Sequence, residues 1–450
     1  MNRIQITSNQ DYPINYRTAS ETGYVIGCQQ LLQNLSQYIP KIILDPRAQT
    51  DPSGLLFTRD HGIRRLDGSL LIPYSFQSSE LEPQFRALQP RTLNGKRFVD
   101  SIKTGFGTGF DPTHREHVLK WAASINQPTR LSTATIEGGN CYIFKDSQQR
   151  PSALIGQNSL LLTLLAMEEQ QLFQSIKTVH NETPSEHAFQ MARNRNLLQT
   201  SLPLNRELTK IQKDIQILFN KDASSNINKI NELQAKQQAL QNELIVQKMM
   251  PSQLNERFQS EVSPQEKLTL LEDAKTFEAK IFLAKETISS ELDIPLNRIA
   301  FLAQSRFHID MEVFPGPKDT VFIHSELLSQ NVTQRDASLQ KYHKESMNRI
   351  TANQAAIEAN REELIKLGLK PILVPGIYEA PGKPTINFMN GLFVRPDLFL
   401  TNDPIKAYWA KETFKEITRP HFTVEFIGDG ILETILTNNA AGLRCLTREF

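Results

Sequence analysis

The sequence FHIDMEV, residues Phe307–Val313, alternates apolar side chains with three titratable ones, His308, Asp310 and Glu312. Successive side chains of a β-strand point to opposite faces, so this alternation predicts a strand with its polar residues on one face. Such a face could line a polar pocket. It could equally be the solvated face of an edge strand, and the segment alone leaves both interpretations open.

Two further segments each place one carboxylate close to glycine. Ile136–Asn140 reads IEGGN, with Glu137 before a glycine pair that lets the backbone turn sharply and a ligand approach. Leu56–Gly62 reads LFTRDHG, with Asp60 after an apolar run, a common position for a ligand-binding acid. Asp and Gly are also ordinary turn residues, so each segment taken alone fits a plain turn.

The three cysteines have different surroundings in the sequence. Cys445 lies in Ala441–Glu449 (AGLRCLTRE), where the neighbouring Arg444 would favour a thiolate, although a lone cysteine is more often a small buried apolar residue. Cys28 and Cys141 lack such a neighbour, and we interpret both as structural. Three cysteines without a CxxC pair predict neither a disulfide framework nor a zinc site, and they suit a reducing compartment.

Taken in this order, the Asp60, Glu137, His308 and Cys445 segments resemble those of the guanidine-modifying (pentein) superfamily. That superfamily includes arginine, agmatine and peptidyl-arginine deiminases, dimethylargininases and amidinotransferases. The stretches ALIGQNSLLLT and INFMNGLFV are similar to framework segments of the agmatine deiminase branch. The resemblance covers about residues 20–158 and 290–450. It implies an α/β fold, a five-bladed pseudo-symmetric α/β-propeller (pentein) with its site at the centre.

The resemblance also implies roles for single residues. Cys445 would be the nucleophile, which attacks the guanidinium carbon and forms a covalent thiouronium intermediate. His308 would act as acid and base, with Glu137 orienting the reacting group near it. Asp60 and Asp310 would hold the planar, forked guanidinium cation. No cofactor and no metal is implied.

Departures from the family pattern leave the branch open. Agmatine deiminases usually carry His before the nucleophile, whereas arginine deiminases often carry the Arg that stands here at position 444. The expected glycine pair is replaced by Ala440-Ala441-Gly442. Four arginines are candidates for binding a substrate carboxylate: Arg59, Arg64, Arg65 and Arg306.

A block rich in Gln, Glu, Lys and Leu predicts a helical, coiled-coil-like insertion over residues 159–290, between parts of the catalytic domain at 1–158 and 291–450. Apolar residues recur there at spacings of three and four on both sides of the polar break Lys221–Asn226, which indicates two helices folded back as a hairpin. Ser263–Glu266 (SPQE) predicts a further helix start. The insertion could pack on the catalytic domain, self-associate or bind a protein partner.

Three functions follow from these observations. The first is a deiminase, a hydrolase acting on arginine, agmatine or a protein arginine. The second is an amidinotransferase, with an amine in place of water, and the third is a non-catalytic interaction protein that uses the insertion. If the hairpin presents the site to a macromolecule, a protein arginine becomes the favoured substrate, and a translocated bacterial effector would fit that role.

Composition excludes several classes. The 450 residues contain 50 Lys and Arg and 49 Asp and Glu, which gives a net charge of +1 and argues against a nucleic-acid binder. No apolar run approaches the roughly 20 residues of a membrane span. The first residues lack the features of a secretory signal, so we expect a cytoplasmic protein, with export by a specialised machine left open. His114 and His117 lack a third metal ligand, in keeping with no metal site.

Overall fold

The computed structural model describes residues 24–45, 59, 62–76, 81–88, 112–173, 184–222, 226–247, 263–304, 308–335, 343–376, 386–404, 407–428, 430–439 and 442–449. Contacts within the chain divide it into two compact units. The first unit is formed by residues 1–78, 98–174 and 281–450, and the second by residues 79–97 and 175–280.

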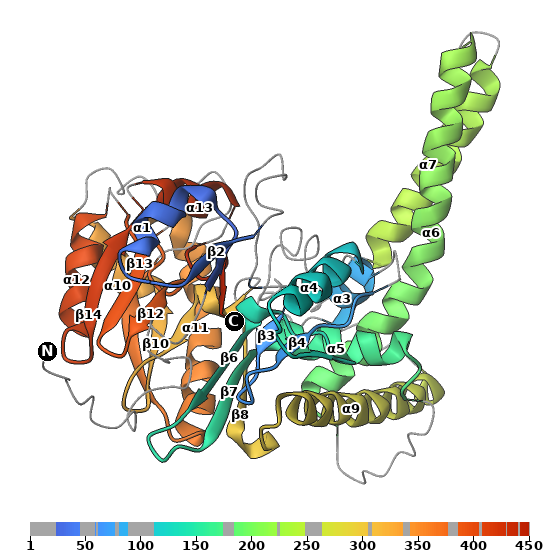
Figure 1. Ribbon diagram of the computed structural model, residues 1–450. Coiled ribbons are helices and arrows are strands. Elements are labelled where there is room, and N and C mark those ends of the chain that lie inside the picture. Colours follow the sequence, from blue (N-terminus) through green and yellow to red (C-terminus); the bar gives the residue numbers. More distant parts are fainter. Residues whose placement is uncertain are drawn as a thin grey trace, which may run out of the picture. The chain divides into compact units, whose positions relative to one another are not determined.

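The first unit contains all the strands of the described part of the chain (Figure 1). They are β1 Tyr24–Ile26, β2 Ile42–Leu44, β3 Ile63–Arg64, β4 Leu70–Ile72, β5 Thr129–Leu131, β6 Cys141–Lys145, β7 Pro151–Gly156, β8 Ile299–Leu302, β9 Val313–Pro315, β10 Thr320–Ser325, β11 Lys370–Pro375, β12 Leu392–Arg395, β13 Leu398–Asn402, β14 Thr423–Ile427 and β15 Thr447–Glu449. Within the described residues they form five three-stranded sheets, ordered β15-β1-β2, β3-β4-β5, β6-β7-β8, β9-β10-β11 and β12-β13-β14.

Each of these sheets follows one strand pattern. The central strand pairs antiparallel with one neighbour and parallel with the other. A parallel pair needs a long crossover connection, usually a helix. Helical segments accordingly separate the two parallel strands in every sheet, as α12 (Tyr408–Thr418) does between β13 and β14. The sheets are therefore five versions of one strand–strand–helix–strand unit.

The other helices of the first unit fill the same crossovers or flank the strands. They are η1 Gln29–Leu31, α1 Leu32–Ser36, α4 Pro112–Ser124, η3 Gly138–Asn140, α5 Gln157–Glu169, η4 Leu296–Arg298, η5 Ile309–Met311, α10 Glu326–Thr333, α11 His343–Lys366 and α13 Ile431–Asn439. Among all helices in the described part of the chain, none is both long enough and apolar enough to cross a membrane.

The predicted α/β class is confirmed, and several short apolar runs of the sequence form strands. The runs Lys41–Leu44, Leu70–Ile72, Cys141–Phe144 and Thr320–Ile323 overlap β2, β4, β6 and β10. Central strands such as β10 and β13 are buried along their whole length, which explains why they read as continuous apolar runs.

The first and last described strands belong to one sheet. β1 pairs antiparallel with β15, with Tyr24 opposite Glu449 and Ile26 opposite Thr447. Around this pairing a core cluster buries Ile26 and Leu31 together with Leu443 and Cys445. The turn that carries Cys445 is thus anchored in a core on one side and in a sheet on the other.

The second unit is helical in its described part. It contains α3 (Leu81–Leu88), α6 (Glu186–Asp222), α7 (Ile227–Gln247) and the first part of α9 (Pro264–Leu292), which continues into the first unit. Figure 1 shows α6 and α7 side by side, as the periodicity predicted. Ile211, Ile230 and Leu240 are buried along this pair. The predicted polar break between two helices is confirmed, since α6 ends at Asp222 and α7 begins at Ile227. The helix start predicted at Ser263–Glu266 is also confirmed, since α9 begins at Pro264.

The prediction of a strand across Phe307–Val313 is wrong. His308 is extended, but Ile309–Met311 form the 3-10 turn η5, and β9 begins only at Val313. All side chains from His308 to Val313 are buried, so the alternation does not separate an inner face from a solvated one. The polar residues face partners inside the protein, which an alternating pattern cannot distinguish from water. Phe307 lies outside the described residues.

Candidate active site

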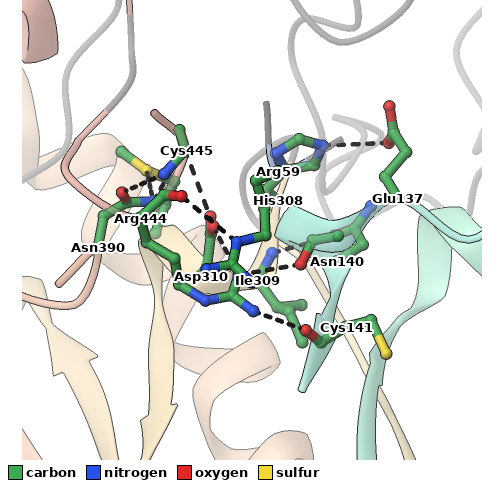
Figure 2. A network of polar contacts seen from close by, with 12 residues as sticks. Arg59, Glu137, Asn140, Cys141, His308, Ile309, Asp310, Asn390, Arg444 and Cys445 are labelled. Atoms are coloured by element: carbon green, nitrogen blue, oxygen red, sulfur yellow. Dashed lines mark hydrogen bonds and ion pairs between the residues drawn. The ribbon is translucent and has the colours of Figure 1, made fainter. Parts of the chain in front are cut away.

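Four of the five predicted site residues meet in the first unit, although they come from segments far apart in the sequence (Figure 2). Glu137 precedes η3 and strand β6, His308 and Asp310 lie at η5, and Cys445 lies in the turn before β15. Their exposed fractions are 4%, 1%, 0% and 2%. The structure therefore gathers two carboxylates, an imidazole and a thiol in a nearly dry environment. Asp60 lies outside the described residues.

Glu137 and His308 form a buried pair. The Nε2 atom of His308 lies 3.1 Å from Oε2 of Glu137, and the second oxygen, Oε1, has no hydrogen-bond partner among the described residues. The imidazole packs against the backbone of Gly139, where a Cβ atom would overlap its Nδ1 atom. This close approach explains the glycine at that position of the IEGGN segment. Glu137 can hold the imidazole in one orientation and stabilise its protonated form.

Asp310 is paired with Arg444. Nη1 of Arg444 lies 2.9 Å from Oδ2 of Asp310, and the two side chains are 5% and 0% exposed. The same guanidinium donates to the carbonyl oxygens of Gly138 at 2.9 Å and Cys141 at 2.8 Å, and its Cζ atom lies 4.0 Å from the Tyr142 ring centroid. Oδ1 of Asp310 has no hydrogen-bond partner among the described residues. Arg444 therefore compensates the charge of Asp310, and only one of the two carboxylate oxygens accepts a hydrogen bond within the described residues.

Cys445 lies between a carboxylate and an amide. Its sulfur is 3.9 Å from Oδ2 of Asp310 and 3.0 Å from Nδ2 of Asn390. The backbone N–H of Cys445 donates to Oδ1 of Asn390 at 3.1 Å. The sulfur thus faces an acceptor for its proton on one side and a donor for its lone pairs on the other.

The other two cysteines are free and buried. Burial raises the pKa of the Cys141 thiol from 9.0 to about 12, although the Arg444 and Arg59 guanidinium groups favour ionisation. Burial also raises the pKa of Cys28, against backbone hydrogen bonds from Gln30 and Leu31. A thiol with a raised pKa is a poor nucleophile at neutral pH, as the structural interpretation of both residues requires.

Three residues that the sequence did not single out, Asn140, Gln304 and Asn390, hold the site together. Oδ1 of Asn140 accepts from the backbone N–H of Ile309 at 3.0 Å and from Nε2 of Gln304 at 2.8 Å, which fixes the start of η5. Asn390 contacts the nucleophile itself. Asn140 and Asn390 lie inside the IEGGN and INFMNGLFV segments, so a signal was present, but only as a resemblance.

Arg59 contributes to the nucleophile turn from a distant part of the chain. Its backbone N–H donates to the carbonyl oxygen of Cys445 at 3.3 Å, and its Nε atom donates to that of Arg444 at 3.4 Å. Arg65, another candidate for a substrate carboxylate, pairs with Asp67 at 2.7 Å. Both side chains thus bind groups of the chain itself, and Arg306 lies outside the described residues.

His308, Asp310 and Cys445 offer nitrogen, oxygen and sulfur atoms that all lie within 4.8 Å of one another, a set that could hold a metal ion. The guanidinium of Arg444 compensates the charge of Asp310 and so weakens its attraction for a second cation. The absence of a resident metal and of a cofactor stays a prediction of the sequence.

No protein-family model and no curated protein sequence matches the chain. Two solved structures of the agmatine deiminase of C. jejuni are similar to it. One is of a variant with substrate bound, with a TM-score of 0.39, 9% identity, and coverage of 94% of this chain and 80% of that chain. The other has a TM-score of 0.38, 9% identity and the same coverage of 94% and 80%. A likeness at this level fixes neither fold nor activity.

Proposed function

We propose that this chain is a cysteine-dependent hydrolase that removes an amine from a guanidino group. One observation carries the proposal: the reactive atoms of Cys445, His308 and Asp310 lie within 4.8 Å of one another in a buried site, with Glu137 on the imidazole. We also propose that the five sheets form a closed five-bladed propeller around this site. The shared strand pattern and the pairing of β1 with β15 support this closure.

The carboxylates of Asp310 and Glu137 each have one oxygen that could bind a guanidinium ligand. Oδ1 of Asp310 and Oε1 of Glu137 are buried without hydrogen-bond partners among the described residues, and such atoms carry a desolvation cost. A planar guanidinium presents several N–H groups in fixed directions and a positive charge, so it could satisfy both oxygens. Asp60, expected as a second carboxylate of this clamp, stays a prediction.

The chemistry follows from the groups present. The Cys445 thiolate adds to the central guanidinium carbon, and His308 gives a proton to the departing amine, which leaves a covalent thiouronium. His308 then takes a proton from water as its oxygen bonds to the same carbon. Collapse of this adduct breaks the carbon–sulfur bond, returns the thiolate and releases a ureido product, and the hydroxyl proton passes to the released ammonia or amine, which leaves as its ammonium ion. One water is consumed and one ammonia, or amine, is released.

The test is turnover by the purified chain of arginine, agmatine and an arginine-containing protein, with ammonia and the ureido product measured together. We expect one substrate to be consumed with equal yields of both products. The variant Cys445→Ala should abolish turnover and keep the fold. The absence of any turnover in a folded wild-type chain would contradict hydrolysis. Consumption that requires an added amine, with no ammonia released, would instead establish an amidinotransferase.

The helical pair supports a second proposal, that α6 and α7 bind a second copy of the chain or another protein. Ile217, Phe219 and Ile227 are large apolar side chains, yet they are 42%, 47% and 48% exposed. Exposed large apolar side chains can belong to interaction surfaces, and the proposal rests on these three. Sedimentation should detect self-association that the variant Phe219→Ser weakens. A chain that is monomeric at all concentrations and unaffected by this variant would contradict self-association.

A further inference from the structure

Asn390 contacts the nucleophile turn through three hydrogen bonds. Its Nδ2 atom donates to the sulfur of Cys445 at 3.0 Å, and its Oδ1 atom accepts from the Cys445 backbone N–H at 3.1 Å. Its own carbonyl oxygen accepts from the backbone N–H of Arg444 at 3.3 Å. The side chain is fully buried. One asparagine therefore holds the nucleophile by both backbone and side chain.

The orientation of the Asn390 amide is determined by its partners. A backbone N–H can only donate, so the amide atom facing the N–H of Cys445 has to be the oxygen. The NH₂ group must then face the sulfur. This matters because a donor aimed at sulfur favours the negatively charged form, whereas an acceptor would favour the neutral thiol.

Two more buried asparagines hold Asn390 in place. Oδ1 of Asn387 accepts from the backbone N–H of Asn390 at 3.0 Å, and its Nδ2 atom donates to the carbonyl oxygen of Met311 at 2.7 Å. Asn402 donates to the carbonyl oxygen of Asn387 at 2.9 Å and accepts from the N–H of Leu443 at 3.2 Å. Gly442 adds to this fit, since a Cβ there would lie 2.8 Å from Asn390 and Asn402 atoms.

We infer that Asn390 is a positioning residue that fixes the Cys445 sulfur and stabilises its thiolate form. Three neighbours act on this sulfur. Asp310, 3.9 Å away, favours the protonated thiol, whereas Asn390 and a protonated His308, with a ring nitrogen within 4.8 Å, favour the thiolate. These opposing effects keep both the thiol and the thiolate form of Cys445 accessible. This inference deepens the proposed function and rests on it for its catalytic meaning, but the state of the sulfur can be measured without any turnover.

The test compares three variants by ultraviolet titration of the thiolate, with Cys445→Ala subtracted so that only Cys445 is observed. Asn390→Asp keeps an acceptor for the Cys445 N–H and replaces the donor by a carboxylate oxygen. Asn390→Ala removes both groups. Asn402→Asp is the matched control, because it makes the same chemical change in a buried asparagine that holds Leu443 and does not contact the sulfur in the described structure.

We expect Asn390→Asp to move the titration midpoint of Cys445 upward by at least one pH unit, about a tenfold loss of thiolate at a given lower pH. Asn390→Ala should move it in the same direction. Asn402→Asp should lower the unfolding temperature and move the midpoint much less than Asn390→Asp does, because Asn402 reaches the sulfur only through Asn387 and Asn390. An unchanged midpoint in folded Asn390→Asp, or an equal shift in Asn402→Asp, would overturn the inference. A shifted midpoint in a chain that turns over no guanidino substrate would uphold it while the proposed function failed.

Discussion

Asp310 and Arg444 form a buried ion pair, 2.9 Å from Oδ2 to Nη1, and that same carboxylate oxygen lies 3.9 Å from the sulfur of Cys445. The residue next to the nucleophile in the sequence thus places its own guanidinium beside the proposed substrate site, on the other oxygen of Asp310. Asp310 would then bridge two guanidinium groups, the permanent one of Arg444 through Oδ2 and the substrate's through Oδ1. Arg444 would then compensate the charge of Asp310 whether or not substrate is bound.

Arg444→Met should strongly destabilise the fold. Asp310 is 0% exposed and would lose its counter-charge, and breaking one side of a buried pair costs about 3–5 kcal/mol. The measurement is urea unfolding, because guanidinium chloride resembles the proposed substrate. The double variant Arg444→Met, Asp310→Asn should recover much of the loss. As a control, Arg361→Met removes an exposed pair with Glu358 and should cost less than about 1 kcal/mol. Equal effects at the two arginines would contradict the buried pair.

Glu137→Gln should lower kcat by roughly 10² to 10⁴, the usual contribution of acid–base groups, because the amide cannot stabilise protonated His308 at 3.1 Å. The side chain keeps its size, so the unfolding temperature should change little. Steady-state kinetics on the preferred substrate, beside a thermal melt, provides the measurement. A kcat within about threefold of wild type would remove Glu137 from the proposed mechanism.

Gly139→Ala should inactivate the protein through His308. The added Cβ would overlap Nδ1 of the imidazole, and displacement of a catalytic group by about 1 Å can cost roughly 10²-fold in rate. If the effect acts through the imidazole, combining Gly139→Ala with His308→Ala should add little to the loss from His308→Ala alone. Full additivity of the two rate losses would show that the glycine acts elsewhere.

Cys141 should resist alkylation in the folded chain up to strongly alkaline pH, because burial raises its pKa from 9.0 to about 12. Between these values only the unfolded chain ionises at this residue, so its contribution to the free energy of unfolding falls as pH rises through the window. Cys141→Ala should flatten this fall in urea unfolding measured across the window. Mass spectrometry after iodoacetamide should find Cys445 labelled before Cys141. Fast native labelling of Cys141 would contradict its burial.

The fold was largely predictable where apolar periodicity is local. The strand runs and the α6–α7 pair follow from spacings that reflect which side chains leave water. The structure of the segment from His308 to Val313 was not predictable, because all of its residues are buried. There the polar residues are satisfied by protein partners, such as Glu137 for His308 and Arg444 for Asp310, and those partners come from distant segments.

The candidate site was predictable only in part for the same reason. The sequence indicated Glu137, His308, Asp310 and Cys445 by their chemistry and order. It could not show that Arg444 faces Asp310, since a residue beside the nucleophile was expected to act on the thiol directly. Asn390 carries no charge and no nucleophile, so nothing in its local sequence distinguishes a contact with sulfur from a turn.

The pairing of β1 with β15 has a consequence for synthesis on the ribosome. β15, the strand that follows the Cys445 turn, pairs antiparallel with β1, which is synthesised long before it. During translation, this edge of β1 stays unpaired until β15 has been synthesised, because contacts between sequence-distant segments form late. The turn that carries Cys445 therefore packs against this sheet only after β15 has been made.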